Sequence, residues 1–173
     1  VRLDEAQLQA MALSDNDAHP IRVVLDPHLS MPLDAKMLSL PGRTILMTCQ
    51  QAVESNSAMV EQLLAQNAEI VAVASVDEKL DIESILHYLA DEEQINDVMV
   101  ETGAVAAGAF VESGYVNEIH AFIAPVLMGH QARPMFELPG IHQMDEKLSF
   151  AISEMDKCGG DVRLILTPKK QQS

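Results

Sequence analysis

The sequence has little positive charge. Lys and Arg together number 11 of its 173 residues, against 26 Asp and Glu, and the formal net charge is −15. Nucleic-acid binding needs a basic face, so this balance argues against a nucleic-acid partner. A phosphate-bearing ligand would also be repelled at long range. Any phosphate site must therefore be local and built from backbone N–H groups or a single arginine.

Cysteine is scarce as well. Cys49 and Cys158 are the only two; they form no CxxC pair, and no Cys/His cluster has the spacing of a zinc site. The six histidines form no HxxxH or HExxH pattern, so we expect no metal. A disulfide framework is excluded, which favours a reducing compartment and predicts a cytoplasmic location.

Long apolar runs are missing too. None reaches the roughly 18 residues of a membrane-spanning helix, so we expect no membrane partner. The first five residues, Val-Arg-Leu-Asp-Glu, are charged and lack the apolar centre of a signal peptide, so none is expected there.

The chain does have a regular alternation of strand and helix patterns. Short β-branched or apolar runs predict strands over 21–26, 43–48, 69–74 and 98–101. Helical spacing predicts helices after an N-cap at 55–57, over 81–90 and over 103–113. Alternating strands and helices favour parallel pairing through right-handed crossovers.

The last third of the chain has a different residue pattern. Residues 116–124 alternate partly and stop at a proline, and 148–155 and 161–167 flank a Cys-Gly-Gly turn typical of a β-hairpin. With no repeat or linker, we predict one α/β domain. It has a mixed, mostly parallel sheet flanked by helices and ends in an antiparallel hairpin.

The segment 97–110 carries the clearest sign of a ligand site. A short apolar strand ends at Glu101, and Gly103 then opens a helix of small residues. In α/β proteins such a turn presents backbone N–H groups to a phosphate. The second glycine, Gly108, gives neither a P-loop nor a GxGxxG fingerprint. Tight packing explains the glycines equally well, and Glu101 could equally be an acid that caps a turn.

Several of these stretches together resemble a known family. They are His-Pro-Ile-Arg-Val-Val-Leu-Asp at 19–26, Val-Glu-Thr-Gly-Ala-Val-Ala-Ala-Gly-Ala at 100–109, Val-Asn-Glu-Ile at 116–119 and Ile-Ala-Pro-Val-Leu-Met-Gly at 123–129. In this order they resemble the C-terminal reductase domain of the bifunctional riboflavin-biosynthesis deaminase/reductase. The resemblance implies a dihydrofolate-reductase-like fold and NADPH as cofactor. It also implies reduction of 5-amino-6-(5-phosphoribosylamino)uracil by hydride transfer to C1 of the ribose.

The resemblance also implies site residues. Glu101 matches the family's substrate-contacting acid, and Arg2, as the end of a Thr-Val-Arg element, matches an arginine that binds the substrate phosphate. Thr48, at a strand end, is a candidate contact for the adenosine side of the cofactor. The matches to the NADPH-phosphate turn are Gly103, Ala104, Val105, Ala106, Ala107, Gly108 and Ala109.

This chain also departs from the family pattern. Pro27 stands where the family commonly has a serine near the cofactor, and Ala104 replaces a usual proline. The family domain opens with a strand and a Ser-Leu-Asp-Gly element, and a zinc-binding deaminase half precedes it. Neither is in this sequence. We therefore expect 1–173 to be a single, partial reductase domain from a longer chain, with weak cofactor binding on its own.

Two other interpretations stay open at this stage. The chain could be a non-catalytic fragment that keeps the fold and dimer contacts, or a dihydrofolate-reductase-like reductase of another pterin or pyrimidine. Members of the family commonly pair through C-terminal sheet edges, so a homodimer is expected, with a small molecule as the other partner.

Overall fold

The computed structural model describes residues 19–76 and 79–169. The chain divides into two compact units, with the division between Gln94 and Ile95. Arg2 lies outside the described residues. Each unit is described by itself below.

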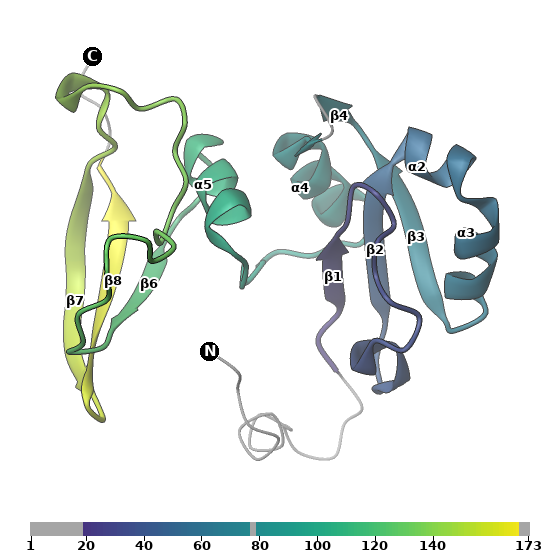
Figure 1. The fold of residues 1–173 in the computed structure, drawn as a ribbon, viewed down its shortest axis with the longest axis horizontal. Helices are drawn as coiled ribbons and strands as arrows, with labels where there is room; N and C mark the ends of the chain where they lie inside the picture. Colours follow the sequence, from purple (N-terminus) through teal and green to yellow (C-terminus); the bar gives the residue numbers. More distant parts are fainter. Residues whose placement is uncertain (1–18, 77–78, 170–173) are drawn as a thin grey trace. The chain divides into compact units, whose positions relative to one another are not determined.

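A three-stranded parallel sheet forms the centre of the first unit. Its strands are β1 (Arg22–Leu25), β2 (Thr44–Cys49) and β3 (Ala68–Val73), in the order β1-β2-β3. Figure 1 shows this sheet with α3 running alongside β3. The three strands predicted from β-branched runs in this part of the chain are thus confirmed.

Between these strands lie η1 (Lys36–Ser39), α2 (Gln50–Ser55) and α3 (Ser57–Leu64). After β3 come β4 (Ser75–Val76), β5 (Lys79–Leu80) and α4 (Ile82–Asp91). The helix predicted after Ser55 begins at Ser57, and Asn56, with a φ of −124°, separates it from α2. The helix predicted over 81–90 is α4; Asp81 caps it by accepting a hydrogen bond from the Ser84 N–H.

The core of this unit lies on both faces of β2. Leu46 packs in one cluster with Ala52 of α2 and Leu63 of α3. Successive side chains of a strand point to opposite faces, so Ile45 and Met47 face the other way. Both are fully buried. Burial on both faces explains why the centre of β2, residues 45–47, is a continuous apolar run rather than an alternating one.

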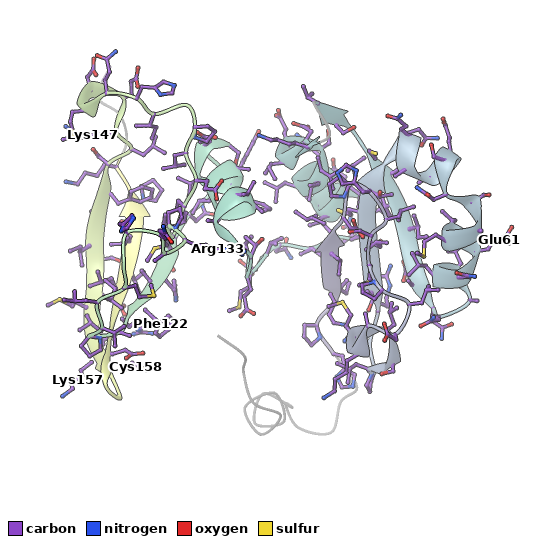
Figure 2. The ribbon with its side chains drawn as sticks, in the orientation of Figure 1. Glu61, Phe122, Arg133, Lys147, Lys157 and Cys158 are labelled. Atoms are coloured by element: carbon purple, nitrogen blue, oxygen red, sulfur yellow. The ribbon has the colours of Figure 1, made fainter. Side chains whose placement is uncertain are left out.

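The second unit contains an antiparallel sheet and one α-helix. The strands β6 (Ile119–Ile123), β7 (Phe150–Cys158) and β8 (Asp161–Pro168) pair in the order β6-β8-β7. The other elements are α5 (Ala104–Glu112) and the short η2 (Met144–Glu146). The predicted hairpin is confirmed, and Gly159 adopts a φ of +61° in its turn. Figure 2 labels Lys157 and Cys158 at this end of β7.

One predicted strand is wrong. Residues 98–101 form no strand among the described residues, and Val98, Met99 and Val100 are exposed rather than buried. Their composition suits a strand, but a strand exists only where its backbone pairs with another. The expected α/β class with helices and a parallel sheet is confirmed. The described parallel and antiparallel strands, however, belong to separate sheets rather than to one mixed sheet.

Candidate functional site

A hollow of about 370 Å³ lies in the first unit, at the edge where the parallel strands end. His28 follows β1, Cys49 ends β2 and Ser75 follows β3, and all three line it. Its remaining lining residues come from α2 and the residue after it: Gln51, Ala52, Ser55 and Asn56. Parallel α/β sheets bind their ligands beyond the carboxyl ends of the strands, so this hollow is a candidate ligand site.

Thr48 lies at this edge but points into the protein. Its side chain is fully buried, and its hydroxyl donates a hydrogen bond of 3.2 Å to the Pro27 carbonyl oxygen. The Cys49 thiol donates to the same oxygen at 3.0 Å. The two bonds tie the end of β2 to the loop that follows β1. A contact of Thr48 with a cofactor stays a prediction.

The turn before α5 is open at its amino end. Gly103 is the N-cap, and no described side chain caps the helix there or places a carboxylate in its first turn. A Cβ built on Gly103 would meet no atom within 4 Å. The first N–H groups of a helix lack partners inside the helix. At this end of α5 they are therefore available to an anion.

Gly108 has a different surrounding. A Cβ at this position would overlap the carbonyl oxygen of Glu137 and lie 2.8 Å from its carbonyl carbon. The Glu137 N–H also donates a 2.9 Å hydrogen bond to the Ala104 carbonyl oxygen. The backbone at Glu137 therefore lies directly against α5, and Gly108 permits that contact. Of the two alternatives left open by the sequence, close packing accounts for this glycine, whereas Gly103 has open space around it.

Glu101 lies two residues before Gly103, in an exposed stretch without regular secondary structure. The sequence predicted that Glu101 ends a strand, but in the structure it does not stand at the end of a paired strand. Its side chain makes no hydrogen bond or ion pair with the rest of the described chain. The acid and the open turn are thus neighbours in sequence on one segment of the second unit.

Two other arginines, Arg22 and Arg133, fall in different places. Arg22 holds the turn before β2 by donating to the carbonyl oxygens of Pro41 (2.8 Å) and Gly42 (2.9 Å), at the amino edge of the parallel sheet. It is therefore committed to structure. Arg133 is exposed on the loop between β6 and η2, where Figure 2 labels it, and has no partner among the described residues.

A cluster of charged side chains lies at the amino ends of β2 and β3. The Arg43 guanidinium contacts Glu69 at 2.6 Å and Glu93 at 2.7 Å. Hydrogen bonds from Arg43 lower the pKa of both carboxyl groups, and burial with Glu93 nearby raises the pKa of Tyr88. Since the cluster lies at the opposite edge of the sheet from the hollow, it serves stability rather than ligand binding.

Sequence reasoning missed the hollow itself. His28 read as one of six scattered histidines and Cys49 as an isolated cysteine. The available signal was their position, because each stands at or just beyond a predicted strand end, where parallel sheets gather ligand contacts. No group of His, Cys, Asp or Glu in the described ranges could hold a metal ion. No helix within those ranges is long and apolar enough to cross a membrane.

Comparisons with known proteins agree on one family. A model described as the RibD C-terminal domain matches residues 1–164. The 5-amino-6-(5-phosphoribosylamino)uracil reductase of Buchnera aphidicola is 26% identical over 172 residues, which cover 98% of this chain and 79% of that protein. The riboflavin biosynthesis protein RibD of Escherichia coli is 31% identical over 164 residues, covering 95% of this chain and 42% of that one.

A solved structure gives the same result. RibD of Acinetobacter baumannii aligns with a TM-score of 0.72 at 28% identity, covering 86% of this chain and 37% of that one. This chain therefore spans less than half of the length of the Escherichia coli and Acinetobacter proteins. The resemblance drawn from the sequence motifs, including the dihydrofolate-reductase-like fold, is confirmed. The chain belongs to the RibD C-terminal domain family.

Proposed function

We propose that the chain is an NADPH-dependent reductase of 5-amino-6-(5-phosphoribosylamino)uracil, which it converts to the ribitylamino compound of riboflavin biosynthesis. The observation that carries the proposal is the open turn at Gly103, next to the exposed acid Glu101, in a member of this family. The Buchnera relative bears the name of this reductase, which supports the choice of substrate.

The turn fits the phosphates of such a cofactor. Gly103 leaves room for an oxygen to approach the backbone, and no carboxylate of the first turn opposes an anion there. A helix N-terminus favours a nearby anion by roughly 0.3–1 kcal/mol. We therefore assign phosphate binding to the stretch from Gly103 to Ala109. Within it, Gly108 contributes by allowing α5 to pack.

The hollow in the first unit fits the adenosine end. Its volume of about 370 Å³ is within the range of small-ligand sites. Gln51, Ser55, Asn56 and Ser75 supply hydrogen-bonding groups to its wall. We assign the adenosine side to this hollow, with Thr48 behind its wall at the end of β2.

In this proposal Glu101 binds and orients the substrate. When bound, NADPH would supply the hydride that reduces C1 of the opened ribose, and the amine nitrogen would take up a proton. The Glu101 carboxylate accepts hydrogen bonds from substrate hydroxyl or amino groups and so fixes the reacting carbon. Arg2, outside the described residues, would bind the substrate phosphate.

The proposal includes three further expectations, on domain organisation, oligomeric state and location. Residues 1–173 act as one partial reductase domain, the chain forms a homodimer through the edges of its C-terminal sheet, and it works in the cytoplasm. Exposed apolar side chains on β6 and β7, among them Phe122, Ile152 and Met155, support the expectation of a partner on this sheet.

The test is the rate of NADPH oxidation with this substrate, compared between wild type and Glu101→Gln. Losing a charged hydrogen-bond acceptor should lower kcat/KM by roughly tenfold to a hundredfold. Glu118→Gln is the matched control, since Glu118 is an exposed acid of the same unit that, within the described ranges, pairs with His120 alone. The role of Glu101 is refuted if both variants keep the wild-type rate.

A further inference from the structure

A buried carboxylate organises the loop that follows β1. Asp26 is 7% exposed and accepts three hydrogen bonds from this loop. Its Oδ1 accepts from the Ser30 hydroxyl at 2.9 Å and from the His28 N–H at 3.4 Å, and its Oδ2 accepts from the Met31 N–H at 2.7 Å. A buried carboxylate is stable only when its oxygens are satisfied in this way. The loop and the acid therefore depend on each other.

The loop needs this support because its middle residue has an unfavourable backbone. Leu29 has a φ of +53°, in the left-handed region that a leucine rarely adopts. Its side chain is 4% exposed and packs in the core cluster of the unit. The donors to Asp26 lie on both sides of Leu29. The carboxylate thus bridges the strained residue and holds it in place.

The same loop forms part of the candidate ligand site. His28 lines the hollow, and the Pro27 carbonyl accepts the bonds from Thr48 and Cys49 at the end of β2. Asp26 itself is not among the lining residues, so it can act only through the loop. The Asp26 N–H also donates to the Met47 carbonyl oxygen at 2.9 Å, which continues the pairing of β1 with β2 by one residue.

We propose that Asp26 is a positioning residue, which fixes the loop 27–31 on the rim of the hollow and thereby sets the affinity for the adenosine end of the cofactor. The inference rests on the proposed function, because it assigns the hollow to that part of NADPH. It predicts that Asp26 affects cofactor binding far more than the chemical step.

The first variant is Asp26→Asn. The amide has one acceptor oxygen, so its NH₂ group would face either the Met31 N–H or the His28 N–H and Ser30 hydroxyl, and the loop would lose an anchor there. We expect the Kd for NADPH, measured by calorimetry, to rise by about tenfold, the factor for one lost charged hydrogen bond. Adenosine 2′,5′-bisphosphate, which lacks the nicotinamide half, should lose affinity by the same factor. The kcat at saturating NADPH should stay within about twofold of wild type.

Two further variants separate positioning from general stability. Ser30→Ala removes one donor and leaves the Asp26 carboxylate with the other two. This variant should therefore fold and weaken NADPH binding by about threefold. Glu69→Gln makes the same acid-to-amide change at the amino edge of the sheet, where it breaks the contact with Arg43. It should lower stability without changing the Kd for either ligand.

The outcomes are distinct. The inference stands if Asp26→Asn and Ser30→Ala raise both the Kd and the KM for NADPH, while kcat and the KM for the pyrimidine stay at their wild-type values. It is overturned if both variants bind NADPH as wild type does, or if kcat falls and the NADPH Kd does not. If Asp26→Asn fails to fold, Ser30→Ala decides by the same criteria. If wild type binds neither NADPH nor the bisphosphate, the proposed function fails, and this inference fails with it.

Discussion

The sharpest structural prediction concerns Gly108. The perturbation is Gly108→Ala, which adds one methyl group on the face of α5 that meets Glu137. Helix propensity alone predicts that this change stabilises the protein, by about 1 kcal/mol in a helix interior. The packing around Gly108 predicts that it destabilises the protein. The new Cβ would overlap the Glu137 carbonyl oxygen and lie 2.8 Å and 3.2 Å from its carbon and nitrogen.

These atoms belong to the backbone, so they cannot rotate away as the end of a side chain could. Overpacking of this kind costs about 1–3 kcal/mol. Moving Glu137 also stretches its hydrogen bond to Ala104, whose net contribution is about 1 kcal/mol. The gain of about 1 kcal/mol in helix propensity offsets the loss of this hydrogen bond. We therefore expect Gly108→Ala to lower the free energy of unfolding by about 1–3 kcal/mol.

Urea unfolding followed by circular dichroism measures this change. Gly103→Ala is the matched control, because it is also a glycine-to-alanine change at α5. Its Cβ would meet nothing within 4 Å, and the φ of −79° suits any residue. It should leave stability within about 0.5 kcal/mol of wild type and lower the affinity for NADPH. A Gly108→Ala variant more stable than wild type would refute the reasoning, since propensity would then outweigh the contact.

Three other predictions concern stability. Arg43 lowers the pKa of Glu69 and Glu93 below the usual 4.5, so their stabilisation is present above that value and is lost as the pH falls through the lower folded values. Arg43→Ala should therefore lower the free energy of unfolding, measured by urea titration at neutral pH, by no more than about 1 kcal/mol, and leave it nearly unchanged in strong acid; equal losses at both pH values would contradict this. Asp81→Ala removes the N-cap of α4 and should lower the thermal midpoint, whereas Asp81→Asn should keep most of it. Gly159→Val places a β-branched residue at a φ of +61° and should cost about 1–2 kcal/mol in a thermal melt; an unchanged midpoint would mean that the hairpin turn relaxes freely.

Local patterns were enough to predict most elements. The strands over 21–26, 43–48 and 69–74, the helix that Asp81 caps and the hairpin at Gly159 all follow from signals within a few residues of each other. Such elements are predictable because the sequence carries their propensity, capping and turn chemistry locally.

What failed was decided by distant residues. Residues 98–101 have the composition of a strand, but pairing depends on another part of the chain, and the described structure supplies no partner. The role of Gly108 depends on Glu137, nearly thirty residues later. Within the candidate site, sequence placed the open turn at Gly103 and Thr48 at a strand end. It could not show that Thr48 is buried or that Asp26 organises its loop, because burial and long-range contacts set both.

Hydride transfer from NADPH to the phosphoribosylaminopyrimidine can be followed with NADPH deuterated at the transferring position of C4, with the product analysed by mass spectrometry. We expect one NADPH to be consumed per product formed, and a ribitylamino product that carries one deuterium at C1. A product without deuterium, or no NADPH consumed in the presence of this substrate, would contradict it.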